Sequence, residues 1–432
     1  MASIEKAAAT TPFTPAECGE RAPSRSLGKA HIALFMRDLE GGGIQKNLLR
    51  LAESFSQQGH TVDLVVYKAK GPHLAHIPPG VNLVALGCMA FKPAARGLAF
   101  GYLLAADPPK LRPSLQPLRL AWDVSPWLKC LPALTRYLRR TRPQALLSAG
   151  NTLNCTAALA RRLANTATRL VVSERNHLSA YTEGKRQRRR WRCLPGLIAR
   201  TYPWADATVA VSNGVADDLA LTAGLSREQI TTVYNPIVSA ELFERAKAPL
   251  SHTWFDSDSI PVILGVGSLN EKKDFPTLLR AFARVREQRA VRLLILGEGD
   301  GHAQLGMLAE ELGVADDVAL PGFTANPFAY MARAAVFVLS SVYEGLPTVL
   351  IEALACGCPV VSTNCPSGPA EILQGGRYGP LVAVGDDRAL ARAILGVLDN
   401  PPDREQLRRR AAEFSVERGS ERYLEILLGT SK

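Results

Sequence analysis

The sequence predicts an α/β protein built from two doubly wound domains, each with a parallel sheet. Short apolar runs alternate with helical patterns twice along the chain, and a polar stretch separates the two series. The length of 432 residues accommodates two domains of ordinary size. With 47% apolar and 21% charged residues, the composition excludes a disordered or fibrous protein. No apolar run reaches 18 residues, so the sequence predicts no transmembrane helix.

The first half contains the first series. Unbroken apolar runs are typical of parallel strands buried on both faces. They predict strands at residues 31–36, 61–67, 81–86, 145–148, 170–173, 208–211 and 230–234. Amphipathic patterns between them predict helices such as 45–57 and 131–140. Residues 88–130 interrupt the alternation with six prolines. An insertion of this length is often functional, lying on a membrane or over a bound ligand, but it can equally be a helical excursion that only packs.

The second half repeats the alternation more regularly. Strands are predicted at residues 261–266, 292–296, 318–320, 336–339 and 359–362, and helices at 275–287, 302–312, 327–334, 348–355 and 403–428.

The domain boundaries follow from these series. Polar residues without an apolar segment predict a disordered tail at 1–28. The first domain spans 29–245, the linker is the polar stretch 246–259, and the second domain spans 260–402. The last segment, 403–432, is a C-terminal helix that we expect to pack back on the first domain.

Basic charge is concentrated in the first half. Residues 1–250 contain 33 Lys and Arg against 17 Asp and Glu, whereas the remainder contains 18 against 23. A basic surface attracts phosphate groups. The densest basic run, at 185–192, has no zinc finger or aromatic RNA-binding motif beside it, so nucleic acid is not an expected partner. The run is either a membrane-facing segment or a solvated helix face.

The eight cysteines are scattered without the paired spacing of a zinc site. We therefore expect a reduced, cytoplasmic chain without a structural metal.

Glycines follow several predicted strands. Gly41, Gly42 and Gly43 come after the first strand and open a helix, where backbone N–H groups can approach an anion. Glycine also simply makes tight turns, so this signal is weak alone. The segment 297–302 resembles a dinucleotide fingerprint only superficially, because His302 stands at the third glycine position.

The strongest local pattern is the segment 340–353, SSVYEGLPTVLIEA. A buried strand ends at residue 339, Glu344 lies in the following turn, and Pro347 stands where a helix begins. Glu352 lies on that helix among apolar neighbours, so this carboxylate needs a partner if it is buried. Both glutamates belong to the carboxyl end of a parallel strand, where open α/β sheets bind ligands. Hydroxyl groups of a sugar would suit them as donors.

These segments resemble the donor-binding domain of a GT-B glycosyltransferase of family 4, a retaining group that uses nucleotide sugars. The resemblance covers residues 30–425 and is most specific in 262–375. The matching segments are 267–275 (GSLNEKKDF), similar to the family's G-R-L-x-x-x-K-(G/D)-F; 296–299 (LGEG), similar to its L-x-G-x-G; 321–323 (PGF), similar to its base-binding turn; Glu344 and Glu352, which match its E-x7-E pair; and 367–372 (SGPAEI), a downstream variant. In the first domain, residues 41–43, 173–177, 211–214 and Asn235 stand where the family places cleft-facing loops.

The resemblance implies a GT-B fold in which the first domain binds the acceptor and the second binds the donor across a cleft. It implies that Lys273 neutralises the donor diphosphate, that Glu344 contacts the transferred sugar, and that Glu352 holds the ribose. His177 either faces the reacting carbon or is structural. The implied donor-binding residues are Gly267, Ser268, Lys273, Gly297, Gly299, Phe323, Thr324, Glu344, Gly345, Leu346, Pro347 and Glu352.

One departure concerns the phosphate cations. The arginine usual in the first segment is replaced by Ser268, so one cation of the family pattern is missing. Arg175 from the first domain could supply it. Together with Asn176 and the glycines 41–43, Arg175 forms the phosphate and acceptor loop that the resemblance implies.

The implied activity is that of a retaining hexosyltransferase. It would move a hexose from a nucleotide diphosphate sugar, with UDP favoured, to a saccharide or lipid-linked acceptor in cell-surface polysaccharide or glycolipid synthesis. The family's chemistry needs no metal or other cofactor. We expect the protein in the cytoplasm, and an anionic inner-membrane surface is a candidate partner for its basic half. Alternatives are a GT-B epimerase or phosphorylase, or a non-catalytic module that binds nucleotide or membrane.

Overall fold

The computed structural model describes residues 28–40, 42–87, 130–183, 189–255 and 260–430. The predicted tail apart from its residue 28, the insertion apart from its residue 130, Gly41 and residues 185–188 of the basic run lie outside the described residues.

Within these ranges, the N-terminal domain is built on a seven-stranded sheet in the order β3-β2-β1-β4-β5-β6-β7, with every pair parallel. Its strands are β1 (His31–Met36), β2 (Thr61–Val66), β3 (Val81–Ala85), β4 (Ala145–Ala149), β5 (Arg169–Glu174), β6 (Ala207–Ala210) and β7 (Ile230–Thr232). Its α-helices are α1 (Gly43–Gln57), α4 (Leu131–Thr141), α5 (Asn151–Ala164), α6 (Leu178–Glu183), α7 (Arg189–Arg192), α8 (Leu194–Thr201) and α9 (Asn213–Ala223).

Alternation along β1 shows how this sheet is buried on both faces. Ile32, Leu34 and Met36 join the apolar cluster that contains α1 and the C-terminal helix α18 (Val416–Leu428). Ala33 and Phe35 point the other way, into the cluster that contains α4 and α5. Successive side chains of a strand face opposite sides of the sheet. The continuous apolar runs of the first half are therefore the expected consequence of two covering helix layers.

The C-terminal domain repeats this architecture. Its six described strands form a parallel sheet in the order β10-β9-β8-β11-β12-β13. They are β8 (Val262–Val266), β9 (Arg292–Leu296), β10 (Val318–Gly322), β11 (Val336–Leu339), β12 (Val360–Thr363) and β13 (Leu381–Val382). The helices are α11 (Phe275–Arg286), α12 (His302–Glu311), α13 (Pro327–Arg333), α14 (Thr348–Ala355), α15 (Pro369–Ile372), α16 (Asp387–Asp399) and α17 (Arg404–Ala412). The prediction of two doubly wound domains is confirmed.

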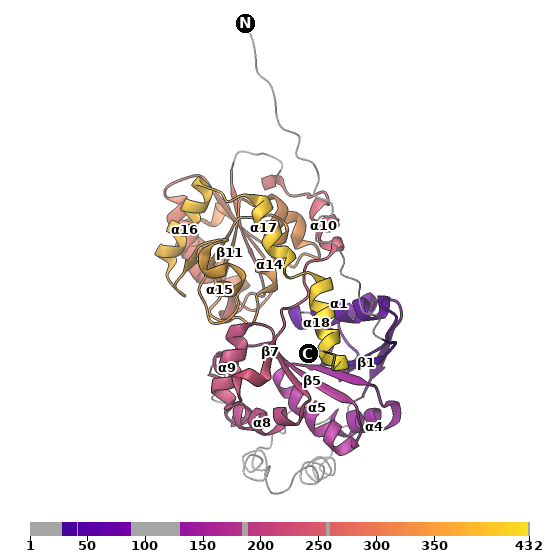
Figure 1. The fold of residues 1–432 in the computed structure, drawn as a ribbon. Helices are drawn as coiled ribbons and strands as arrows, with labels where there is room; N and C mark the ends of the chain where they lie inside the picture. Colours follow the sequence, from indigo (N-terminus) through magenta and orange to yellow (C-terminus); the bar gives the residue numbers. More distant parts are fainter. Residues whose placement is uncertain (1–27, 41, 88–129, 184–188, 256–259, 431–432) are drawn as a thin grey trace.

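The chain crosses from one domain to the other twice, and the two crossings lie side by side. The outgoing crossing lies near Val238, before α10 (Ala240–Lys247), and the returning one lies near Ser415. The backbone N–H of Val238 donates to the carbonyl of Phe414 at 3.1 Å, and the N–H of Val416 donates to the carbonyl of Val238 at 2.9 Å. The crossing precedes the linker expected at 246–259, because α10 already packs on α13 of the C-terminal domain. Figure 1 shows α10 beside that domain.

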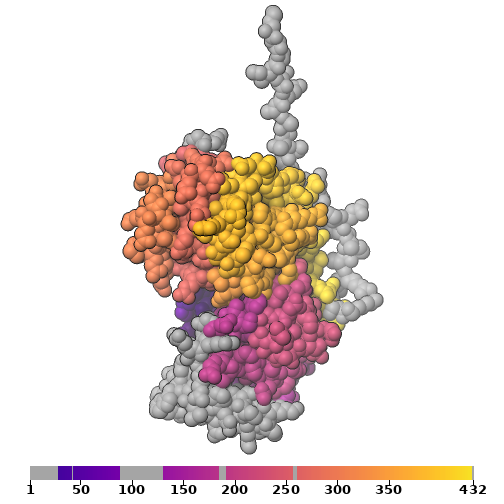
Figure 2. Space-filling view, turned by 90° about the vertical axis from the view of Figure 1, so that its left-hand side faces the viewer, coloured from indigo at the N-terminus to yellow at the C-terminus, as the bar shows by residue number. Residues whose placement is uncertain are grey.

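One predicted element is wrong in its extent. The single helix expected at 403–428 is two helices, α17 and α18, separated by residues 413–415. The break lies where the chain returns to the N-terminal domain, and Ser415 caps α18 by accepting a hydrogen bond from the N–H of Arg418. Helix α18 then lies beside α1 and the strands β4 and β5. Figure 1 shows α18 next to α1, with the C-terminus at its end. The space-filling view shows the two domains in direct contact (Figure 2).

Candidate functional site

The candidate site lies at the carboxyl ends of β8 and β11, which are neighbours in the C-terminal sheet. From β8 the chain runs in one direction across the sheet to β9 and β10, and from β11 it runs in the other, so the strand order reverses between them. Ligands of open α/β sheets bind at such a reversal. The β8 loop contains Lys272 and Lys273, and the β11 loop contains Glu344.

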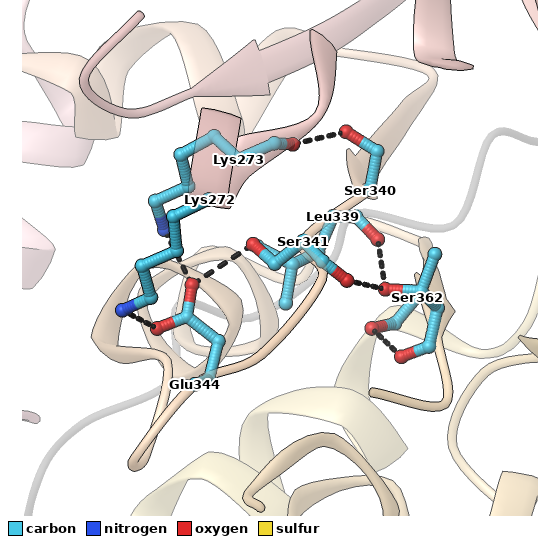
Figure 3. A network of polar contacts seen from close by, with 8 residues as sticks. Lys272, Lys273, Leu339, Ser340, Ser341, Glu344 and Ser362 are labelled. Atoms are coloured by element: carbon cyan, nitrogen blue, oxygen red, sulfur yellow. Dashed lines mark hydrogen bonds and ion pairs between the residues drawn. The ribbon is translucent and has the colours of Figure 1, made fainter. Parts of the chain in front are cut away.

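The Glu344 carboxylate binds both lysines. Lys273 Nζ lies 2.7 Å from Oε1 and Lys272 Nζ lies 2.8 Å from Oε2. The hydroxyl of Ser341 also donates to Oε1, at 2.9 Å. Figure 3 shows the two lysine side chains reaching this carboxylate side by side, with Ser341 approaching from the β11 loop. The sequence singled out Lys273 and Glu344 but assigned no role to Lys272.

These cations decide the protonation of Glu344, which is only 5% exposed. Burial on its own raises the pKa of this carboxyl group, but Lys273 and Lys272 outweigh burial and lower the pKa to about 2. The group is therefore ionised throughout the physiological range. Two ammonium groups face one carboxylate, so the cluster has a net positive charge.

Backbone contacts fix the two loops to each other. The hydroxyl of Ser340 donates to the carbonyl of Lys273 at 2.7 Å, and the N–H of Val342 donates to the carbonyl of Lys272 at 2.9 Å. The N–H of Glu344 donates to the carbonyl of Pro366 at 3.0 Å. The main chain of both lysines is thus held by the β11 loop, and their ammonium groups are held by Glu344.

Two of the predicted glycines allow the loop after β9 to approach the loop after β8 closely. A Cβ on Gly297 would lie 1.8 Å from the carbonyl oxygen of Gly267, and a Cβ on Gly299 would lie 2.6 Å from that of Leu269. Ser268 lies in the same loop after β8. After β10, the Phe323 ring is 69% exposed and Thr324 accepts a hydrogen bond from the N–H of Asn326. An exposed aromatic ring there is suited to stacking on a flat ligand.

The turn after Glu344 contacts the N-terminal domain. A Cβ on Gly345 would lie 2.2 Å from the carbonyl oxygen of Arg175, so only glycine allows this approach. The hydroxyl of Ser212 donates to the Gly345 carbonyl at 2.7 Å. Leu346 and Pro347 are buried beside it. These residues, expected to shape a pocket, also form the contact between the domains.

Glu352 has the partner that its burial demands, and it comes from the other domain. Glu352 is 5% exposed, and Arg50 Nη2 of α1 lies 3.7 Å from its Oε1. Arg50 Nη1 also donates to the Asn47 side chain and to the carbonyl of Pro236, at 3.4 and 3.5 Å. Sequence reasoning predicted that a partner was needed but could not identify Arg50, which lies about 300 residues away.

The glycine loop of the N-terminal domain faces the start of α14. Gly42 has a φ of 127°, a conformation that favours glycine, and Gly43 begins α1. A Cβ on Gly43 would lie 3.7 Å from Thr348 Cγ2. Two helix N-termini therefore approach each other across the domain boundary, and each presents unpaired backbone N–H groups.

The Arg175 side chain is directed into its own domain. Nη1 donates to Asn235 Oδ1 at 2.7 Å, Nη2 donates to the Tyr423 hydroxyl at 3.3 Å, and the residue is 6% exposed. Only its backbone carbonyl reaches the C-terminal domain. The guanidinium therefore does not join the lysine cluster, contrary to the expectation that it replaces the missing arginine.

His177 is also held by its own domain. Its Nδ1 lies 3.4 Å from Asp218 Oδ1 and 3.2 Å from the Ser179 hydroxyl. The preceding residue, Asn176, donates its backbone N–H to Glu174 Oε1 at 3.3 Å. The structure thus brings Lys273, Glu344 and Gly345 together, and places Arg175 and His177 in a supporting loop.

Two glutamates lie in segments that the sequence singled out, 173–177 and 367–372, but neither side chain was assigned a role. Glu174 ends β5, is fully buried, and accepts hydrogen bonds from the Tyr202 hydroxyl at 2.9 Å and from the N–H of Arg175 at 3.0 Å. Burial raises the pKa of Glu174 to about 7, although these hydrogen bonds oppose the rise. The signal in the sequence was an acidic residue at the end of an otherwise apolar strand.

Glu371 joins the domains. Its carboxylate accepts hydrogen bonds from the backbone N–H groups of Asn213 and Gly214 at the start of α9, both at 2.8 Å. The Tyr234 hydroxyl donates to it at 3.2 Å. A negative charge is favourable at a helix N-terminus. The segment 367–372 therefore contains an inter-domain contact as well as a sequence motif.

Membrane spans and metal sites can be judged over the described residues. Within those ranges, no helix is both long and apolar enough to cross a membrane. In the same part of the chain, no group of three or more His, Cys, Asp or Glu side chains could hold a metal ion.

Comparisons with known proteins agree with this architecture. The family model described as "Glycosyl transferases group 1" matches residues 255–414, and the model "Glycosyltransferase Family 4" matches residues 41–241. A Campylobacter jejuni protein named N-acetylgalactosamine-N,N'-diacetylbacillosaminyl-diphospho-undecaprenol 4-alpha-N-acetylgalactosaminyltransferase is 33% identical over 54% of this chain and 63% of its own. The Rhizobium meliloti lipopolysaccharide core biosynthesis glycosyltransferase LpsE is 36% identical over 39% and 49%. The chain thus spans less than two thirds of either relative.

Solved structures match over nearly the whole chain. The lipopolysaccharide outer core galactosyltransferase WaaB superposes with a TM-score of 0.65 at 17% identity, covering 93% of this chain and 100% of that one. The complex of Anabaena Alr3699/HepE with UDP-glucose superposes with a TM-score of 0.69 at 17% identity, covering 93% and 100%. At these identities the likeness establishes the fold.

Proposed function

The chain belongs to the GT-B glycosyltransferases of the family 4 type, and we propose that it is a retaining hexosyltransferase. The donor is a nucleotide diphosphate sugar, with UDP as the nucleotide, and the acceptor is a saccharide or lipid-linked saccharide of a cell-surface polymer or glycolipid. The observation that supports this most directly is the buried Glu344 carboxylate with Lys273 beside it, at the carboxyl ends of β8 and β11. The Glu344 carboxylate can accept hydrogen bonds from sugar hydroxyls, and the Lys273 ammonium group can bind a phosphate.

The proposed roles follow from the chemistry of each side chain. Lys273 stabilises the negative charge that develops on the leaving nucleotide diphosphate. Glu344 accepts hydrogen bonds from the sugar hydroxyls, and Glu352 accepts those of the ribose. The exposed Phe323 ring stacks on the base. Gly42 and Gly43 bring backbone N–H groups of α1 toward the same phosphates.

Glu344 is a poor nucleophile and a poor base in this environment. With a pKa of about 2, it has little tendency to take a proton near neutral pH. Both of its oxygens contact ammonium groups. We therefore propose that the acceptor attacks on the face that the diphosphate leaves, and that the diphosphate takes the acceptor proton. The sugar keeps its anomeric configuration without a covalent enzyme intermediate.

The printed names of relatives and structural neighbours support the choice of substrates. Anabaena Alr3699/HepE has been solved with UDP and with UDP-glucose. The Campylobacter jejuni relative is named for a diphospho-undecaprenol acceptor, and LpsE is named for lipopolysaccharide core biosynthesis. An acceptor with a diphosphate group would suit the basic first half of this chain. We propose that the protein works in the cytoplasm at the inner-membrane surface.

The test is a panel of UDP-, GDP- and ADP-hexoses, read by thermal shift and by release of the nucleotide diphosphate. A donor that binds only the folded chain raises Tm. We expect UDP-hexoses to raise it and UDP to be released slowly. Glu352→Ala should abolish the shift, whereas Glu344→Ala should keep the shift with UDP and lose discrimination between sugars. Glu244→Ala, on the exposed surface of α10, is the matched control.

Other results of these assays would indicate a different function. Interconversion of the sugar without its release would indicate an epimerase, and a requirement for inorganic phosphate would indicate a phosphorylase. Absence of turnover with every donor and acceptor would indicate a binding module. Equal shifts with UDP and UDP-sugars in the unmodified protein would contradict the role of Glu344. Loss of activity on addition of EDTA would contradict a metal-independent reaction.

A further inference from the structure

Lys272 and Lys273 both pair with the buried carboxylate of Glu344, and the proposed function assigns a role to Lys273 alone. Lys272 Nζ lies 2.8 Å from Glu344 Oε2, and Lys273 Nζ lies 2.7 Å from Oε1. The two lysine side chains are 29% and 16% exposed, and the glutamate side chain is 6% exposed. Lys272 therefore resembles Lys273 in its partner, its distance and its partial burial.

The charges do not balance within this cluster. Among the residues that the structure describes, neither lysine has an ion pair with any carboxylate other than Glu344. A partly buried charge without a counter-ion is unfavourable. The excess of one positive charge favours an anionic ligand, and a diphosphate has enough negative charge and oxygen atoms to bind both ammonium groups at once.

We propose that Lys272 is the second diphosphate-binding cation of this site, and that Glu344 releases both lysines to the diphosphate when the donor binds. The inference rests on the proposed function and extends it. Ser268 stands where the family pattern has an arginine, and Arg175 is held by Asn235 and Tyr423. Lys272 supplies the missing charge from within the C-terminal domain.

The exchange needs only side-chain rotation. The carbonyl groups of Lys272 and Lys273 are fixed by Val342 and Ser340, so the main chain need not move. A lysine ammonium has three donors on a flexible four-carbon stem and can change acceptors. Lys272 Nζ also lies over the Tyr343 ring, 5.3 Å from its centre, in a cation–π contact.

The exchange would couple the two halves of the donor. In the structure, each Glu344 oxygen accepts from one ammonium group, and Oε1 accepts from Ser341 as well. Sugar hydroxyls compete with these donors for the same lone pairs. When the lysines turn to the diphosphate, the carboxylate becomes available to the hydroxyls. Sugar recognition by Glu344 should therefore require the diphosphate.

The experiment compares Lys272→Met with the unmodified protein by calorimetric titration with UDP, uridine and UDP-glucose. Methionine keeps the length of the stem and removes the charge. We expect the affinity for UDP to fall tenfold or more and the affinity for uridine to stay within twofold. The salt dependence of UDP binding should become shallower. Lys272→Arg should retain UDP binding, and Lys247→Met, in an exposed ion pair on α10, is the control.

Each failure has a distinct signature. If the unmodified protein binds UDP and Lys272→Met binds it equally well, the inference is overturned and the proposed function stands. If the unmodified protein binds no nucleotide diphosphate, the proposed function fails with it. A crystal structure of the unmodified protein with UDP provides a test that needs no variant. Lys272 Nζ should contact a phosphate oxygen, and continued pairing with Glu344 alone would contradict the exchange.

Discussion

Each domain has a buried glutamate at or just after the carboxyl end of an inner strand, and the surroundings of the two glutamates shift their pKa values in opposite directions. Glu174, which ends β5 of the N-terminal domain, is fully buried and contacts a phenol and two backbone N–H groups. Glu344, in the loop after β11, is 5% exposed and contacts two ammonium groups. The pKa of Glu174 is raised to about 7, and that of Glu344 is lowered to about 2.

The difference shows that dipoles alone do not replace a counter-ion in a buried site. Hydrogen bonds from Tyr202 and the loop amides lower the pKa of Glu174 but do not overcome its burial. At Glu344 the full charges of the lysines do overcome it. The C-terminal domain thus presents charge that persists at every physiological pH. The N-terminal domain uses its glutamate to anchor the loop that contains Arg175, Asn176 and His177.

Removal of one lysine is expected to have the largest effect on the difference between Glu174 and Glu344. In Lys273→Met, Glu344 keeps a single cation, so its pKa should rise from about 2. Turnover should fall by about 100- to 1,000-fold, the usual cost of losing a group that stabilises developing charge. The ratio kcat/KM measured against pH would show both effects. Lys247→Met should behave as the unmodified protein, and a loss there of similar size would contradict the assignment.

The second prediction concerns stability and Glu174. The pKa of its carboxyl group is about 7 in the folded chain, against an ordinary value of 4.5 for a solvated glutamate, so the folded state holds the extra proton. Stability should therefore fall by about 3 kcal/mol as the pH rises from below 4.5 to above 7. Glu174→Gln, which resembles the neutral acid, should remove this decline. Urea denaturation at pH 5 and pH 8 measures the free energy of unfolding at each pH. An equal fall in this free energy between the two pH values in both proteins would contradict the prediction.

Glu344 should show the opposite dependence. Its pKa is lowered from 4.5 to about 2, so its ionised form stabilises the fold above pH 4.5. This stabilisation is lost as the pH falls from 4.5 toward 2. Because the lysines are partly exposed, we expect a loss of about 2 kcal/mol rather than the full value. Acid titration followed by circular dichroism should show a smaller loss in Glu344→Gln.

The smallest effect is expected from Tyr202→Phe. This change removes the phenol that donates to Glu174 Oε2 at 2.9 Å. The same hydroxyl accepts from Asn154 Nδ2 at 2.9 Å, so the folded chain should lose about 1 to 2 kcal/mol, the typical contribution of two hydrogen bonds. The midpoint of the Glu174 transition should move above pH 7, because one group that opposes the effect of burial is gone. Carboxyl stretching bands in infrared spectra would report that midpoint.

Patterns that are local in the sequence predicted most of the fold and part of the site. Apolar runs located every described strand except the two-residue β13 (Leu381–Val382). The pattern around Glu344 and Glu352 placed both after the end of a strand, and the family resemblance added Lys273. Such patterns carry no information on where a long side chain points. They therefore assigned Arg175 to the phosphates, although it binds Asn235 and Tyr423.

Contacts between residues of distant segments could also not be predicted from the sequence. The partners Arg50 and Glu352 come from different domains, as do Asn213 and Glu371. The local pattern around Glu352 called for a partner without identifying it, and no local pattern marked Arg50, Asn213 or Glu371 as half of a pair. Their pairing depends on how the two domains meet, which short-range periodicity does not encode. The break at 413–415 was missed for the same reason, since it is fixed by contact with Val238.

Helix α18 has a consequence for how this protein is made. Tyr423, Leu424, Ile426 and Leu427 complete the apolar layer that covers β1, β2 and β4, yet they follow the entire second domain in the sequence. During translation, the first domain emerges from the ribosome with that face only partly covered, by α1 but not yet by α18. It can reach its final state only after the second domain has been synthesised. A nascent chain halted near residue 245 should therefore expose apolar surface and attract chaperones.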